Sequence, residues 1–102
     1  MTRHLPTSAR AHLNPQNLRV LLAIEEHGSL SRAARQVNLV PSAVSRRVTE
    51  LEQSLGTQLL RRSAHSAEFT AAGRTVLSRA RAILGEMDAL AVDLAALSAG
   101  TR

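Results

Sequence analysis

The segment from residue 42 to 52 has two chemically different sides, and it constrains the fold more than any other part of the chain. In a helix, one side carries apolar residues at spacings of four, three and four: Val44, Val48, Leu51 and Leu55. This side predicts an anchor in a hydrophobic core. The opposite side carries Ser42, Ser45, Arg46 and Thr49. Small hydroxyls and a guanidinium at the N-terminal end of a helix can enter a DNA major groove and donate to bases and phosphates.

The residues upstream of this helix predict a helix-turn-helix. Residues 28–37 are typical of a short helix with an N-cap at Ser29 or Ser31 and a packing face of Ala33, Ala34 and Val37. Residues 38–41 interrupt the helical pattern. Pro41 suits the first position of the helix that follows.

A two-stranded wing is predicted downstream. Gly56 ends the second helix as a C-cap, and residues 59–62 and 68–70 form short strands around a tip at residues 63–67. A supporting helix is expected from Asn14 and Pro15 to about Gly28. The expected fold is therefore mainly α, a winged helix-turn-helix of three helices and a two-stranded wing, followed by a long C-terminal helix.

Residues 71–97 form the longest periodic segment, with an apolar stripe that persists for about four heptads. At about 1.5 Å per residue such a helix extends about 40 Å, which is too long for one small domain to cover. We therefore expect a dimerisation helix, and the alternative is a helix folded back on its own domain. The predicted dimer residues are Val76, Leu77, Ala80, Ile83, Leu84, Met87, Leu90, Ala91 and Leu94.

The domain organisation expected from these patterns has four parts. Residues 1–14 form a flexible N-terminal arm, 15–70 the winged helix-turn-helix, 71–98 the linker and dimerisation helix, and 99–102 a hinge or tail. The length of 102 residues suits one such domain with its extra helix.

The charge of the chain is strongly basic and unevenly distributed. Thirteen arginines, no lysine and eight acidic residues give a formal net charge of +5. Six of the arginines lie within residues 28–66, against Glu50 and Glu52, whereas residues 82–97 hold three acids and no arginine. This distribution favours a polyanionic partner at the helix-turn-helix and wing.

Several classes of site have no counterpart in the sequence. The chain has no cysteine, and no stretch approaches the roughly 20 apolar residues of a membrane span. Its histidines, which we interpret as solvated surface residues, lack the spacing of a metal site: His4, His12, His27 and His65. Without a nucleophile–base pair or a glycine-rich phosphate loop, we expect no enzyme, no cofactor and no metal, in a protein of the cytoplasm.

From about Leu18 to Ala80 the chain resembles the DNA-binding domain of LysR-type transcriptional regulators. The matching residues are Gly28-Ser29, Ala33-Ala34, Ser42-Ala43-Val44-Ser45-Arg46, Leu51-Glu52, Leu55-Gly56, Leu59, Arg62, Thr70 and Ala72-Gly73. The resemblance implies sequence-specific binding of double-stranded DNA in bacterial transcription regulation. It also implies a homodimer that forms through the linker helix and binds an inverted-repeat site. A higher oligomer is a further option for a full-length form. The family's inducer-binding domain is absent here, so we expect either a truncation at the hinge or a stand-alone domain.

The residues assigned to the DNA interface are Ser31, Arg32, Pro41, Ser42, Ala43, Ser45, Arg46, Arg47, Thr49, Arg61, Arg62 and His65. Arg46 is expected to read a base or a phosphate. Ser45 either contacts phosphate or bonds back to its own helix. Arg47 reaches phosphate, pairs with Glu50, or does both. Arg62 contacts phosphate or packs as a structural arginine, and the position of its strand favours the structural role.

Two positions depart from the family pattern. The recognition helix of the family commonly opens with a hydroxyl cap and then a glutamine, where this chain has Val40 and Pro41. Neither side chain can supply a hydrogen bond. The wing tip, which often carries an arginine, has His65, so we expect weaker and pH-dependent wing anchoring.

Two other functions are alternatives to the reading of double-stranded DNA. A winged-helix module for protein interaction has the same fold, and a salt-dependent gel shift would distinguish it. Single-stranded nucleic-acid binding is disfavoured because the chain has a single aromatic residue, Phe69, for base stacking.

Overall fold

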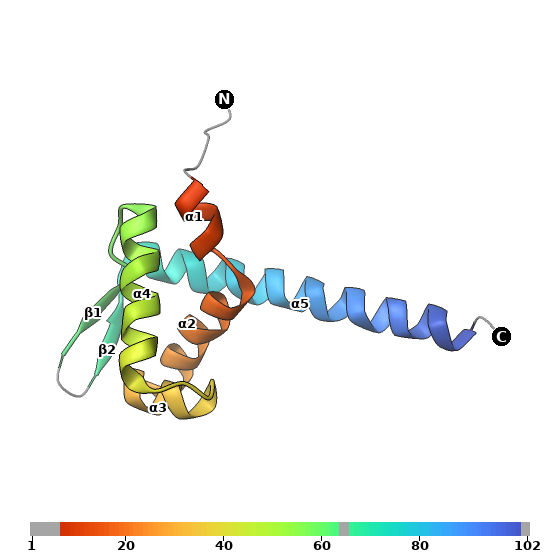
Figure 1. Ribbon diagram of the computed structural model, residues 1–102, viewed down its shortest axis with the longest axis horizontal. Coiled ribbons are helices and arrows are strands. Elements are labelled where there is room, and N and C mark those ends of the chain that lie inside the picture. The colour runs from red at the N-terminus through yellow and green to blue at the C-terminus, as the bar shows by residue number, and fades with distance from the viewer. Residues whose placement is uncertain (1–6, 64–65, 101–102) are drawn as a thin grey trace.

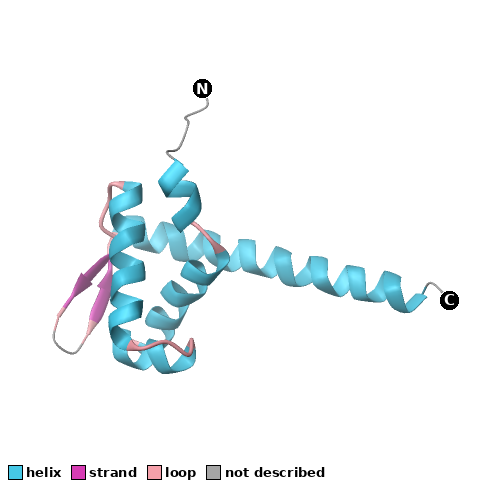
Figure 2. Ribbon diagram, viewed as in Figure 1, coloured by secondary structure: helices cyan, strands magenta, loops and turns pink. Residues whose placement is uncertain are grey.

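Four helices and a two-stranded hairpin surround one apolar core, and a long helix leaves that core and extends away from it (Figures 1 and 2). The computed structural model describes residues 7–63 and 66–100. The elements in chain order are α1 (Thr7–His12), α2 (Pro15–His27), α3 (Leu30–Gln36), α4 (Pro41–Leu55), β1 (Leu60–Arg62), β2 (Ala67–Phe69) and α5 (Ala71–Gly100). The predicted winged helix-turn-helix with a long C-terminal helix is confirmed.

The helix boundaries follow from capping residues in the sequence. The Asn14 side chain accepts from the backbone N–H of Asn17 at 2.9 Å, with proline next in the chain. Ser29, rather than Ser31, caps α3 by accepting from the N–H of Arg32 at 3.2 Å. Gly56 ends α4 in the left-handed region at φ 70°, which glycine adopts without steric cost.

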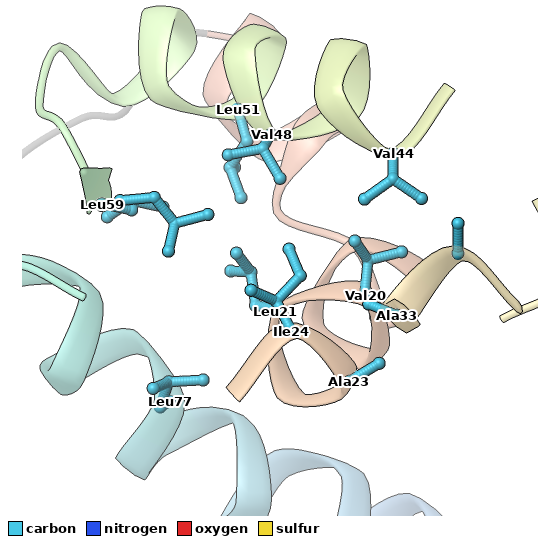
Figure 3. Packing of buried hydrophobic residues seen from close by; sticks show 12 residues of the cluster. Val20, Leu21, Ala23, Ile24, Ala33, Val44, Val48, Leu51, Leu59 and Leu77 are labelled. Carbon is cyan, nitrogen blue, oxygen red and sulfur yellow. The ribbon is translucent and has the colours of Figure 1, made fainter. Parts of the chain in front are cut away.

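The core is formed where α2, α3, α4 and α5 meet β1. In Figure 3 the apolar side of α4 points toward α2, with α3 and α5 closing the cluster. The predicted anchor of α4 is confirmed, because Val44, Val48 and Leu51 are all buried. The largest fully buried side chains are Leu21, Ile24, Leu51, Leu59, Leu60, Val20, Val44 and Val48. The exposed side of α4 is thereby oriented away from the core.

The wing is an antiparallel hairpin in which Arg61 of β1 lies opposite Glu68 of β2. The hairpin is attached to the helices by the N–H of Ala67, which donates to the carbonyl of Gly28 at 3.3 Å. β1 begins one residue later than predicted, and β2 begins and ends one residue earlier, so Ala67 belongs to β2 and Thr70 lies outside it. The Thr70 hydroxyl instead accepts from the N–H of Gly73 at 3.1 Å and so caps the first turn of α5.

The first half of α5 packs on the domain and the second half is exposed. Leu77 and Ala80, which the sequence assigned to the dimer seam, are only 3% and 0% exposed and pack in the core of this domain, although Ala80 also lines a surface groove between α5 and the start of α2. They belong to the core because α5 lies against α2 for its first three turns. Arg81 reinforces this contact through an ion pair with Glu25 of α2. No helix in the described part of the chain is long and apolar enough to cross a membrane.

The predicted flexible arm is wrong for residues 7–12, which form α1 and pack against α4. The physical reason is that two asparagines bond carbonyls at the end of α1. Asn14 Nδ2 donates to the carbonyl of Ala11 at 2.9 Å, and Asn17 Nδ2 donates to that of His12 at 2.7 Å. The remainder of the predicted arm, residues 1–6, lies outside the described residues.

Candidate nucleic-acid interface

The surface that the sequence assigned to DNA is centred on the outer side of α4. Pro41, Ser42 and Arg46 are exposed there, whereas Ala43 is half-buried. Ser31 and Arg32 lie exposed in the first turn of α3, the preceding helix of the motif. Figure 1 shows the wing beside α4 and the α3–α4 loop at its N-terminal end. We call this outer side of α4, with the first turn of α3, the reading surface.

Arg62 connects the wing to the reading surface. Its guanidinium donates to Ser45 Oγ at 2.6 Å and to Thr49 Oγ1 at 3.1 Å, and its Nη2 lies 3.7 Å from Glu52 Oε1. These three acceptors lie along one side of α4. Arg62 therefore has the structural role that the sequence favoured, and it holds β1 against the recognition helix.

The contacts of Arg62 determine which hydrogen bonds the hydroxyls of Ser45 and Thr49 can still make. Each hydroxyl oxygen accepts a hydrogen bond from the guanidinium, so its own proton stays free to be donated. Both residues are half-buried beside the wing. Among the described residues, no hydrogen bond runs from Ser45 Oγ back to a carbonyl of its own helix. A half-buried hydroxyl held by a guanidinium is a well-placed donor for a phosphate oxygen.

Glu52, near the C-terminal end of α4, also positions the wing, a role that the sequence analysis missed. Its Oε2 accepts from the backbone N–H groups of Leu59 at 2.8 Å and of Leu60 at 3.1 Å. These bonds fix the start of β1 on the last turns of α4. No local pattern identifies such a role, because the donors are backbone groups seven and eight residues away.

Arg47 faces the other side of α4, toward α1 and α2. Its Nη1 donates to Asn17 Oδ1 at 3.3 Å, and Asn17 is itself buried. Pairing with Glu50 is not among the ion pairs of the described residues. Arg47 thus supplies a donor to the oxygen of a buried amide, a packing role that the sequence did not indicate.

The remaining charged candidates lie on the wing. Arg61 is exposed on β1, opposite Glu68 in the hairpin register. His65 lies outside the described residues, and so does its predicted effect on wing anchoring. His27 is half-buried rather than solvated; its Nε2 is buried, has no hydrogen-bond partner among the described residues and lies 3.9 Å from Glu26 Oε2. Within the described ranges, no three His, Asp or Glu side chains gather as a metal site.

The arrangement combines a rigid helix, a hydroxyl-rich exposed side and exposed arginines on α3, α4 and the wing. The family model for bacterial regulatory helix-turn-helix proteins of the lysR family matches residues 15–74, the segment that carries these features. The chain belongs to the LysR family. LysR proteins are DNA-binding transcriptional regulators and not enzymes, in agreement with the expectation from the sequence.

Individual LysR-family relatives agree with this membership. The probable HTH-type transcriptional regulator YhaJ of Escherichia coli K12 is 41% identical over 88 residues, which cover 86% of this chain and 30% of the relative. The small neutral protease regulatory protein of Streptomyces coelicolor is also 41% identical over 88 residues, covering 86% of this chain and 27% of the relative. The chain therefore spans less than a third of the length of these LysR regulators.

Solved structures of LysR DNA-binding domains have the same fold. The CbnR_DBD–DNA complex has a TM-score of 0.74 and 32% identity, over 85% of this chain and 99% of that chain. The BenM_DBD/catB site 1 DNA complex has a TM-score of 0.82 and 26% identity, over 88% of this chain and 100% of that chain. The described fold thus matches nearly the whole of these two DNA-binding domains.

Proposed function

We propose that this chain binds a specific sequence of double-stranded DNA and regulates bacterial transcription, with α4 in the major groove. The observation that carries the proposal is the exposed row of Ser42 and Arg46 on a helix whose other side is fully buried. A helix of this kind fits the major groove, and a guanidinium can donate two hydrogen bonds to a guanine. Arg62 supports the proposal because it holds the wing beside this helix.

We further propose that the functional unit is a two-fold dimer formed through α5. The outer half of this helix exposes a row of large apolar side chains, namely Ile83, Met87, Leu90, Leu94 and Leu97. The row continues into an apolar groove of about 230 Å³ between α5 and the start of α2, lined in part by Leu13, Leu18, Val76 and Ala80. An exposed stripe of this length on a small domain favours an interface with a second copy.

The spacing of the row specifies an antiparallel register. With Met87 at the two-fold axis, Leu90 of one subunit lies opposite Ile83 of the other. Leu94 and Leu97 then lie over the apolar groove of the partner, near its Ala80 and Val76. The same register brings Arg79, at the edge of the groove, opposite the exposed Asp93. Apolar and charged positions are therefore both complementary in this arrangement.

A two-fold dimer presents two copies of α4 to one side of a duplex. Operator symmetry mirrors protein symmetry, so the proposed binding site is an inverted repeat with half-sites about one helical turn or a multiple of it apart. Binding chromosomal DNA places this function in the bacterial cytoplasm. The activity of a longer protein, including any inducer response, would be added to this DNA-binding unit.

Selection of bound sites from a random duplex pool tests the proposed function. We expect enrichment of an inverted repeat by the wild-type chain. The Arg46→Ala variant is the control, because it leaves the core intact and removes one exposed guanidinium. If both chains recovered the same sequences, without enrichment over the starting pool, sequence reading by α4 would be contradicted.

A further inference from the structure

The start of α4 differs from the starts of α2, α3 and α5. Side chains cap α2, α3 and α5, whereas the N-cap residue of α4, Val40, makes no side-chain hydrogen bond. A valine at this position forgoes the stabilisation that serine, threonine or asparagine would provide. The fold alone gives no reason for valine at this cap.

Packing does not explain Val40 either. Its side chain is 63% exposed, whereas Val44, one turn further along α4, is 0% exposed. Among the described residues, the other strongly exposed large apolar side chains lie mostly on the outer half of α5. Val40 is therefore an isolated apolar group at the tip of the reading surface.

The neighbours of Val40 limit what it can recognise. Pro41 is also exposed and has no N–H, so neither residue offers a side-chain donor or acceptor. The Val40 carbonyl accepts from the N–H groups of Ala43 and Val44 at 3.0 and 3.2 Å. This tip can thus make only apolar contacts through its side chains. A single isopropyl group is too small a patch to bind a protein partner.

The major groove offers one apolar group on its base edges, which is the C5-methyl of thymine. We propose that Val40, supported by Pro41, contacts a thymine methyl, so that each half-site prefers thymine at one position. The proposal rests on the proposed function, in which the N-terminal end of α4 enters the major groove. It makes Val40 a specificity-determining residue, while Ser42 and Arg46 supply the polar contacts.

Replacement of thymine by uracil tests the proposal, because this change removes the methyl group and keeps the hydrogen-bonding pattern of the base. Each thymine of the selected duplex is replaced in turn, symmetrically in both half-sites. Loss of one buried methyl per half-site corresponds to about fourfold weaker binding, or roughly fifteenfold for the symmetric site. We expect this loss at one position only. A 5-methylcytosine replacing cytosine in a C variant of that position should strengthen binding again.

The variant Val40→Thr replaces a methyl by a hydroxyl at nearly constant volume. The new hydroxyl can cap α4, so the melting temperature should rise, while the thymine-to-uracil ratio at that position should fall toward one. A residue with a merely structural role would not change the two readouts in opposite directions. Val92→Thr is the matched control, since Val92 is 66% exposed on α5, away from α4. We expect it to leave the thymine-to-uracil ratio unchanged.

The outcomes separate this inference from the proposed function. Tight, salt-dependent binding of the selected duplex with no uracil effect at any position would overturn the role of Val40 and keep DNA reading by α4. An equal uracil effect in the wild-type chain and in Val40→Thr would also overturn it. Failure to bind any duplex would overturn both proposals.

Discussion

Arg62 of β1 donates a 2.6 Å hydrogen bond to Ser45 Oγ of α4, and this contact joins the wing to the reading surface. The same guanidinium reaches Thr49 and approaches Glu52, so it spans the side of α4 nearest the wing. Arg62 therefore orients the wing relative to α4, together with the bonds that Glu52 accepts at the start of β1. Arg62, which the sequence assigned to the DNA interface, thus makes its contacts within the protein.

Arg62→Ala should lower the free energy of unfolding by about 1–2 kcal/mol, because charged hydrogen bonds to half-buried hydroxyls are lost. Solvent screening keeps this loss small, since the Arg62 side chain is 30% exposed. Affinity for a selected duplex should fall as well, because β1 loses its contacts with Ser45 and Thr49 of α4. Urea denaturation and fluorescence anisotropy measure the two effects.

Arg61→Ala provides the control for this prediction. Arg61 is the exposed neighbour on the same strand and is predicted to contact phosphate without reading a base. We expect little change in stability and a uniform loss of affinity on selected and random duplexes. A destabilisation equal to that of Arg62→Ala would show that the contacts of Arg62 with α4 contribute nothing specific.

Glu52→Gln should destabilise the domain by about 1–2 kcal/mol, because the charged acceptor of two backbone N–H groups and the partner of Arg62 is replaced by a neutral amide. Glu50→Gln is the matched substitution on the exposed side of the same helix and should change stability by less than about 0.5 kcal/mol. Chemical denaturation at fixed protein concentration compares them. Equal stabilities would remove Glu52 from the account of wing positioning.

Gly73→Ala should be strongly destabilising, since a Cβ at this position would lie 2.2 Å from the backbone oxygen of Leu59. The first turn of α5 packs directly on the residue before β1, and overpacking there should cost about 3 kcal/mol. Gly85→Ala is the contrasting change, because a Cβ there meets nothing within 4 Å. It should raise the helix stability by about 1 kcal/mol, as alanine replaces glycine within a helix. Thermal denaturation of both variants in the same buffer would show opposite shifts.

The elements of this fold were predictable because their signals are local. Asn14, Pro15, Ser29 and Gly56 cap or start helices through contacts within a few residues. The contact of Arg62 with Ser45 joins residues 17 positions apart, so no periodicity could indicate it. The same limit explains the missed helix α1 and the core positions of Leu77 and Ala80, which the sequence assigned to the dimer seam. A single apolar stripe cannot show where the domain core ends and an intersubunit seam begins.

The proposed register of the dimer predicts a charge-reversal experiment. Arg79→Asp should weaken dimerisation by about tenfold, because two like-charge pairs with Asp93 replace two opposite-charge pairs. The double variant Arg79→Asp, Asp93→Arg should restore dimerisation to within about threefold of the wild type. Sedimentation equilibrium measures the dissociation constants. A double variant that dimerises no more tightly than Arg79→Asp would exclude this register.

Binding of the selected duplex at several salt concentrations tests the central claim most directly. Arg32, Arg46 and Arg61 are exposed in each domain, so a dimer brings six such arginines to phosphates and bases. The logarithm of the association constant should fall with the logarithm of salt concentration with a slope of about −5, and a scrambled duplex should bind much more weakly at physiological salt. An affinity that is independent of salt, or equal for the selected and scrambled duplexes, would contradict sequence-specific DNA binding by this chain.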